Sequence, residues 1–124
     1  MSVETVIEIN RTLVAETGEP HFLRDRGLLE GAVARPQNAF AYGEDNVVAL
    51  AVRLMAGIAQ SHAFEQGNKR TAFTAMRLLL LANGHDLGFD DSEEWANEVV
   101  TFIEHRSTEE DFVALVDPYI VPRD

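Results

Sequence analysis

The sequence contains no cysteine, so neither a disulfide nor a thiolate metal site can form. It has no apolar run approaching the roughly 20 residues that cross a bilayer. Its first ten residues lack the basic and apolar regions of a secretory signal. The period-two alternation of β-branched residues that marks strands is absent as well. These absences predict a soluble, cytoplasmic, helical protein without a membrane segment, and 124 residues are enough for a single domain, 1–124.

A net positive charge is confined to one segment of the chain. The formal net charge is −11, and residues 84–124 hold twelve acids against only Arg106 and Arg123. Residues 46–83 reverse this balance. They contain one acid, Glu65, and four cations: Arg53, Lys69, Arg70 and Arg77. Nonspecific nucleic-acid binding needs a basic face, so the acidic remainder argues against a direct nucleic-acid partner. A concentrated cationic centre suits one small polyanion better.

Apolar residues recur with a helical period along most of the chain, which predicts an all-α bundle of five to six helices. Caps and breakers place the first helix at 3–16 with Ser2 as N-cap and Gly18 as the stop. The second is predicted at 25–34, ending before Pro36, and Gln37 to Glu44 is predicted to be a loop.

The third helix is predicted at 46–61, capped by Asp45, and the fourth from Asn68 or Lys69 to Ala82, with Asn83-Gly84 as its stop. Both are apolar on nearly all sides, which predicts that they form the buried central pair. A fifth helix is expected from Asp91 or Ser92, carrying Trp95, Val99, Phe102 and Ile103. A sixth is expected to start at Ser107, with Glu110 completing a capping box, and to end before Pro118.

The connection between the two central helices is unusually rich in functional side chains, reading HAFEQGNKR from His62 to Arg70. Gly67 permits backbone geometry that other residues resist, and the unpaired N–H groups of the fourth helix follow it directly. Such a helix N-terminus is a ready anion site. Lys69 and Arg70 in the first turn oppose the helix dipole, a conflict that a bound anion would resolve.

Each of these residues also has an ordinary structural interpretation. His62 could simply cap the third helix, and Gly67-Asn68 could be a common turn followed by a solvated cationic pair. Phe64 is expected to be a core residue, and Arg77 to pair with a carboxylate. His21, His85 and His105 show no partner spacing and are interpreted as surface or capping residues. A phosphate-handling site is favoured because the ordinary interpretations would all have to hold within nine residues.

The segment His62–Arg70 resembles the H-x-F-x-x-G/A-N-K-R signature of Doc (death-on-curing) toxins, within the wider Fic family. The resemblance extends to Arg24–Glu30, to Ala34–Gln37 and to Asn83-Gly84. It implies a Fic/Doc-like fold with the motif between two central helices. Fic enzymes that transfer AMP usually have Gly where this chain has Lys69, and a second Arg where it has Phe73.

The Doc pattern implies the toxin of a type II toxin–antitoxin system, a kinase that moves the γ-phosphoryl of ATP to a threonine of elongation factor Tu and arrests translation. His62 would engage the target hydroxyl, while Asn68, the amides around Gly67, Lys69 and Arg70 would hold the phosphates. Phe40 and Tyr42 correspond to the region that docks the target. A cognate antitoxin would neutralise the toxin through a C-terminal tail that folds into a helical groove.

One position departs from the family pattern, because Gln66 stands where a carboxylate normally holds Mg²⁺. A neutral amide is a poor replacement, since Mg²⁺ favours anionic oxygen ligands. Three outcomes are open: Gln66 binds the metal weakly, Glu65 takes over, or catalysis is reduced or altered. The alternatives to the kinase are therefore an AMP transferase, transfer to another target, and a catalytically weak nucleotide- or antitoxin-binding module.

Overall fold

The computed structural model describes residues 1–88, 101–102, 104 and 107–122. Its elements, in chain order, are α1 (Val3–Glu16), α2 (Arg26–Ala41), α3 (Val47–Ser61), α4 (Asn68–Ala82), β1 (His85–Leu87), α6 (Glu109–Val116), the 3₁₀ turn η1 (Asp117–Tyr119) and β2 (Ile120–Pro122). The predicted all-α class is confirmed. The predicted absence of strands is wrong at β1 and β2, which pair antiparallel. Three-residue strands are too short to show a period-two pattern in the sequence.

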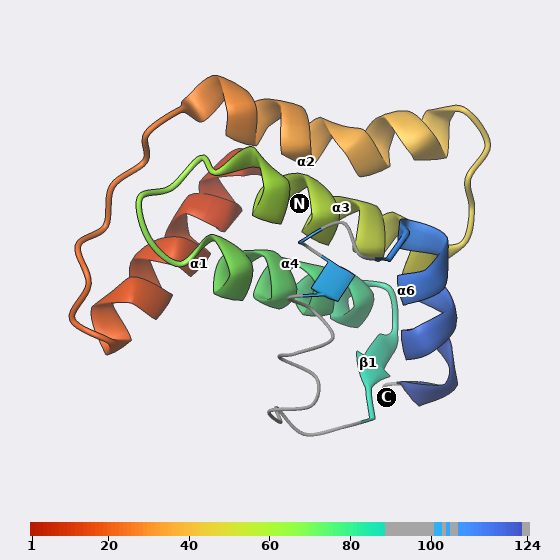
Figure 1. The fold of residues 1–124 in the computed structure, drawn as a ribbon. Coiled ribbons are helices and arrows are strands. Elements are labelled where there is room, and N and C mark those ends of the chain that lie inside the picture. The colour runs from red at the N-terminus through yellow and green to blue at the C-terminus, as the bar shows by residue number, and fades with distance from the viewer. Residues whose placement is uncertain (89–100, 103, 105–106, 123–124) are drawn as a thin grey trace.

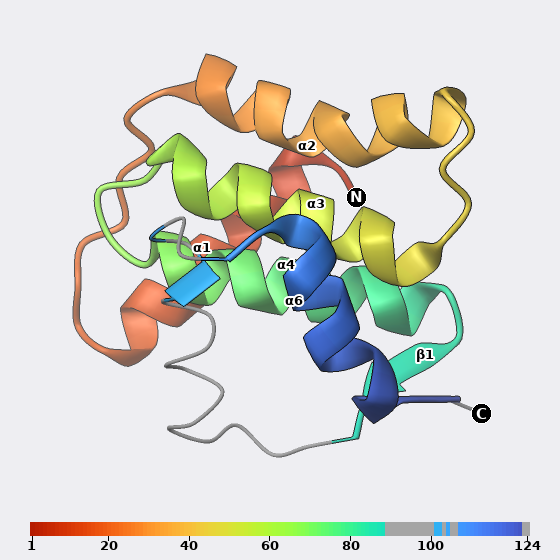
Figure 2. The ribbon, with the colours of Figure 1, turned by 45° about the vertical axis from the view of Figure 1, so that its right-hand side comes forward.

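The central helix is α3, which packs on α2, α4 and α6, while α1 packs mainly on α4 (Figure 1). Consecutive helices α2, α3 and α4 run antiparallel, so the α2–α3 and α3–α4 connections lie at opposite ends of α3, as both ribbon views show (Figure 2). Nine residues of α3 are buried, on nearly all sides of the helix. The prediction that α3 and α4 form the buried central pair is confirmed for α3 and for the buried face of α4.

Helix α2 is longer than predicted, because it continues through Pro36 to Ala41. A proline inside a helix removes one backbone hydrogen bond and costs about 3 kcal/mol. Here Pro36 is buried and extends the apolar stripe of Leu29, Ala32 and Val33. The stripe lies close to α3, where a Cβ added to Gly57 would stand 3.2 Å from Ala32. Burial against α3 offsets the lost bond, so residues 37–41 are helix and not the predicted loop.

Several helix ends follow the predicted signals, and two caps move by one residue. Ser2 caps α1, and Gly18 and Gly84 adopt positive φ after α1 and α4, as predicted. The cap of α3 is Asn46 and not Asp45, since Asn46 Oδ1 accepts from the N–H of Val48 at 2.9 Å.

Likewise α6 is capped by Thr108, with Asp111 completing the box, in place of Ser107 and Glu110. In both cases two adjacent residues are good caps, and the sequence alone does not choose between them. Most of the predicted fifth helix, including Trp95 and Val99, lies outside the described residues. Within the described part of the chain, no helix has the length and apolar character needed to span a membrane.

Candidate active site

Residues 62–67 form the loop between α3 and α4, which we call the motif loop. Its core residues anchor it in the protein, and its polar side chains face outward. Phe64 is fully buried, as predicted for a core residue, and Ala63 beside it is buried too. His62 ends α3 in the left-handed conformation, with φ 51° and ψ 36°, and its side chain is exposed. The anchored Phe64 therefore fixes the loop while leaving the His62 imidazole open to solvent and to a ligand.

A second chain segment, the connection between α1 and α2, holds the backbone of the motif loop. The N–H of Arg24 donates to the Ala63 carbonyl at 2.7 Å, and the N–H of Glu65 donates to the Phe22 carbonyl at 2.9 Å. The Arg24 guanidinium also lies 3.4 Å from the Glu65 carboxylate. The loop conformation is thus set by contacts more than 35 residues away in the sequence as well as by its own residues.

Asn68 closes the motif loop from the other side. Its side-chain Oδ1 accepts from the N–H of Phe64 at 3.1 Å, and its Nδ2 donates to the Phe64 carbonyl at 2.8 Å. The Asn68 side chain is therefore engaged within the loop, and the group it can offer a phosphate is its backbone N–H. Its predicted role in holding phosphate is therefore limited to this backbone N–H.

The N-terminus of α4 carries unpaired amides. Gly67 is its N-cap residue, with φ 77°, and no side chain caps the helix. Among the described residues, none accepts a hydrogen bond from the N–H groups of residues 67 to 70. A Cβ at Gly67 would lie 3.1 Å from Val14 Cγ1 and 3.2 Å from Asn10 Nδ2. Glycine is required here both for the positive φ and for the close approach to α1.

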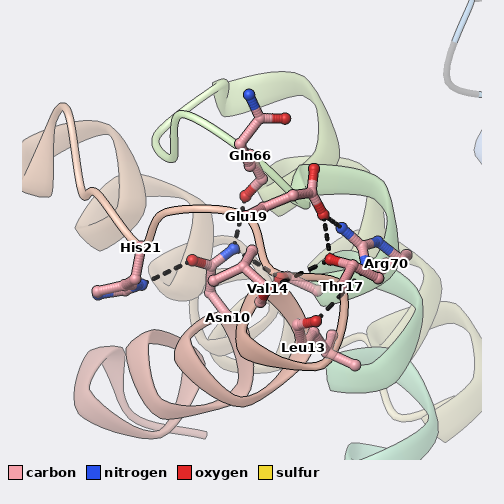
Figure 3. A network of polar contacts seen from close by, with 9 residues as sticks. Asn10, Leu13, Val14, Thr17, Glu19, His21, Gln66 and Arg70 are labelled. Atoms are coloured by element: carbon pink, nitrogen blue, oxygen red, sulfur yellow. Dashed lines mark hydrogen bonds and ion pairs between the residues drawn. The ribbon is translucent and has the colours of Figure 1, made fainter.

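The two cations of the first turn differ in their surroundings. Lys69 is exposed and has no ion-pair partner among the residues that the structure describes. Arg70 pairs with the Glu19 carboxylate, and its Nη1 also donates to Thr17 Oγ1 at 3.4 Å (Figure 3). The hydrogen bond from Thr17 and the bond from Arg70 lower the pKa of Glu19, which keeps that carboxylate ionised. Glu19 thus supplies an anion for one of the two cations, a partner that the sequence did not predict.

Beneath the motif loop lies a buried polar group, the Asn10 cluster, consisting of Asn10, His21, Thr71 and the carbonyl of Gln66. Asn10 Nδ2 donates to the Gln66 carbonyl at 2.8 Å and to Thr71 Oγ1 at 3.1 Å, and its Oδ1 lies 2.8 Å from His21 Nδ1 (Figure 3). Asn10 and Thr71 are fully buried. Burial, and secondly the charge of Arg11, lower the pKa of His21, which favours its neutral form.

The Asn10 cluster corrects the sequence-based interpretation of the histidines. His21 is half-buried and hydrogen-bonded to a core residue, so it is neither a surface residue nor a cap. His85 lies in β1, half-buried, and His105 is outside the described residues. A signal for the cluster did exist, because Asn10 falls between Val6 and Val14 on the buried face of α1. A polar residue at a core position needs a partner, but the sequence could not identify it.

The doubtful metal ligands do not form a cation site. Figure 3 shows the Gln66 side chain pointing away from Asn10, while its carbonyl points toward it. Glu65 is paired with Arg24. Within the described ranges, no three His, Asp or Glu side chains come together to hold a metal ion. At the motif loop, the described residues therefore offer Mg²⁺ a single carboxylate, that of Glu65, and it is paired with Arg24.

The structure brings His62, Glu65 to Arg70 and the unpaired amides together, but it separates them from the predicted docking aromatics. Phe40 and Tyr42, 65% and 93% exposed, lie at the end of α2, where α3 begins. The 15 residues of α3 put about 22 Å between that end and the motif loop (Figure 1). Arg77, by contrast, makes the predicted structural ion pair, 3.0 Å from Asp86.

Comparison with known proteins agrees with this geometry. Residues 1–80, which contain α1, α2, α3, the motif loop and most of α4, match the model of the Fic/DOC family. A protein named Toxin Doc from Mycolicibacterium smegmatis (strain ATCC 700084 / mc(2)155) is 44% identical over 86 residues. The match covers 64% of this chain and 65% of the relative, so the chain spans just under two thirds of that protein's length. Together with the helical fold and the motif between its two central helices, the family match over more than half of the chain shows that this protein belongs to the Fic/DOC family.

Proposed function

We propose that this protein is a Doc-type toxin that transfers the γ-phosphoryl group of ATP to a threonine of elongation factor Tu and thereby arrests translation. The observation that carries the proposal is the start of α4, where four backbone N–H groups without protein acceptors lie beside Lys69 and Arg70. Amides and cations at a helix N-terminus are suited to hold and neutralise phosphate oxygens. The 44% identity to a protein named Toxin Doc supports the toxin role.

In the proposed reaction, the exposed His62 accepts the proton of the target hydroxyl. The hydroxyl oxygen forms a bond to the γ-phosphorus, the bond to the bridging oxygen of ADP breaks, and ADP leaves with the electron pair. Lys69, which has no ion-pair partner among the described residues, supplies a point charge to the phosphates. Arg70 supplies a second charge when phosphate replaces Glu19 at its guanidinium.

The exposed aromatics at the far end of α3 are proposed to dock the target protein. Phe40 and Tyr42 are among the most exposed large apolar side chains of the described residues. Exposed aromatic side chains are typical anchors of protein interfaces. Because about 22 Å of α3 separates them from His62, a target that uses both contacts must extend along the helix.

A second candidate function follows from Gln66, whose neutral side chain does not replace a metal-binding carboxylate. In this alternative the protein binds a nucleotide or an antitoxin but catalyses weakly. AMP transfer is a third outcome, disfavoured because Lys69 and Phe73 replace the residues that typical AMP transferases carry.

The decisive experiment incubates the purified chain with elongation factor Tu and ATP labelled at either the γ- or the α-phosphate. Label transferred from the γ position supports the kinase, label from the α position indicates AMP transfer, and no label with measurable ATP binding indicates the binding module. Glutamate or aspartate at position 66, introduced as Gln66→Glu or Gln66→Asp, increases the rate if metal binding is limiting.

The partner proposed for the cell is a cognate antitoxin whose C-terminal tail folds onto the helices. Such a partner is expected for a protein similar to one named Toxin Doc. Co-expression with the product of the neighbouring reading frame is expected to restore growth that the toxin alone arrests.

A further inference from the structure

We infer that Asn10 is a positioning residue for the phosphate site, because it fixes the orientation of the peptide that joins Gln66 to Gly67. This inference rests on the proposed phosphate site and adds residues of α1 and of the α1–α2 connection to it. Asn10 lies 56 residues from Gln66 in the sequence, yet its side chain donates to the Gln66 carbonyl at 2.8 Å.

The geometry of a trans peptide supplies the first step. The carbonyl and the following N–H of one peptide plane point in opposite directions. Asn10 holds the Gln66 carbonyl toward the core, so the N–H of Gly67 points away from the core, and it meets no acceptor among the described residues. If this peptide flipped, a carbonyl oxygen would replace that N–H and would repel a phosphate.

The second step concerns the Asn10 amide, which itself could be turned either way. Its Nδ2 faces two oxygens, the Gln66 carbonyl and Thr71 Oγ1, and its Oδ1 faces His21 Nδ1 at 2.8 Å. A carbonyl oxygen can only accept, so the amide nitrogen must be the atom next to Gln66. Oδ1 then requires a donor, and the Nδ1–H of His21 provides it. His21 therefore fixes the orientation of Asn10, as Asn10 fixes that of the Gln66–Gly67 peptide.

Because Asn10 is buried, the orientation of its side-chain amide is strongly favoured over the flipped one. The side chain is fully buried, and all of its hydrogen-bonding atoms have partners. A flipped state would leave buried polar atoms without partners, which is unfavourable. Gly67 also packs on the cluster, since a Cβ there would stand 3.2 Å from Asn10 Nδ2. Asn10, oriented by His21, thus acts on the one peptide that begins the proposed phosphate-binding turn.

The experiment compares Asn10→Asp, which replaces the donor with an oxygen at constant size, with the control Thr71→Val. Thr71→Val removes another hydrogen bond of Asn10 but leaves the Gln66 contact in place. The orientation of the Gly67 N–H is measured by residual dipolar couplings on the ¹⁵N-labelled full chain, and ATP binding by calorimetry. Asn10→Asp is expected to reorient the Gly67 N–H and to weaken ATP binding at least about tenfold, the effect of losing one hydrogen bond to a charged group. Thr71→Val is expected to lower the melting temperature while leaving both readouts unchanged.

His21 provides a second pair of variants if Asn10→Asp does not fold. His21→Leu removes the donor to Asn10 Oδ1, whereas the side-chain nitrogen in His21→Asn takes the place of Nδ1 and is expected to rescue both readouts. An unchanged Gly67 N–H orientation in Asn10→Asp and His21→Leu, or an equal loss in Thr71→Val, would overturn the inference. Wild-type protein that binds no ATP would refute the proposed function alone, because the N–H orientation still decides the role of Asn10.

Discussion

Two arginine–carboxylate clusters lie beside α3, one against its first half and one near its last residues, and the clusters differ in what surrounds them. In the first half of α3, Arg53 lies 3.9 Å from the Glu109 carboxylate of α6, and Arg35 of α2 lies 2.9 Å from the same carboxylate. At the end where α3 stops, Arg70 of α4 pairs with Glu19, which follows α1. Both clusters join elements that are distant in the sequence.

The surroundings distinguish a structural arginine from one available to a ligand. Glu109 ties α6 to α2 and α3, and Arg35 also donates to the Arg53 carbonyl at 3.3 Å, so these charges connect helices. A hollow of about 580 Å³ beside them is lined by Arg35, Arg53 and Glu44, so its charges are of both signs. Around Arg70, by contrast, four amides and Lys69 have no protein acceptor or ion-pair partner among the described residues. An arginine beside unpaired amides, and not the arginine alone, indicates a phosphate site.

The largest effect is expected from removing the His62 imidazole, which lies at the end of α3 next to the motif loop. His62→Ala is expected to reduce phosphoryl transfer at least 100-fold, the usual loss for a general base, while ATP affinity changes less than twofold. Transfer is measured with γ-labelled ATP, and affinity by calorimetry.

The matched control is His85→Ala, the same substitution in β1 beyond the far end of α4, which is expected to leave the transfer rate unchanged. An equal rate for His62→Ala and wild type would remove His62 from the mechanism. In cells, induced wild-type protein is expected to stop growth, and His62→Ala is expected to relieve the arrest.

A smaller effect is expected from neutralising the carboxylate of each cluster. Glu19→Gln releases Arg70 for phosphate and is expected to tighten ATP binding about two- to fivefold, the range for one exposed charge contact. Glu109→Gln in the other cluster is expected to leave ATP binding unchanged and to lower the free energy of unfolding by about 1 kcal/mol, because both partners are only partly buried. Weaker ATP binding by Glu19→Gln would show instead that Glu19 orients Arg70 for its ligand.

The sequence was sufficient for those parts of the fold that depend on neighbouring residues. Helical periodicity placed α1 at its observed bounds and α4 within one residue, because their caps and stops are local. It failed at Pro36, where burial against α3 overrides a local breaker, and at β1 and β2, whose pairing joins segments more than 30 residues apart.

The residues of the candidate site also form two groups: those adjacent in the sequence and those brought together only by packing. Gly67 and the cations that follow it are adjacent in the sequence, so the sequence alone is enough to predict an anion site at the start of α4. Glu19, Asn10 and His21 come from another segment and reach the motif loop only through packing. The separation of Phe40 and Tyr42 from His62, by contrast, follows from the predicted third helix, which lies between them in the sequence.

The smallest expected effect is on the pH dependence of the free energy of unfolding, to which His21 beneath the motif loop is expected to contribute. The pKa of His21 is lowered by burial, so the folded protein binds fewer protons at this site than the unfolded chain. The free energy of unfolding is therefore highest when the pH is above about 6.5, the ordinary pKa of histidine in the unfolded chain. It falls as the pH drops below that value. None of the described residues that line the hollow beside Arg35 and Arg53 is a histidine.

Denaturant unfolding between pH 7.5 and 5 is therefore expected to show a loss of stability that is reduced in His21→Asn, which keeps the donor to Asn10 but cannot titrate. The hydrogen bonds from Thr17 and Arg70 lower the pKa of Glu19, which moves its titration further from this pH range. Parallel pH profiles for His21→Asn and wild type would mean that His21 titrates normally and is not confined by the Asn10 cluster. A reduced slope together with unchanged ATP affinity at pH 7.5 would establish that the pH-sensitive element of the fold lies beneath the motif loop, at the end of α3 where we propose the phosphate site.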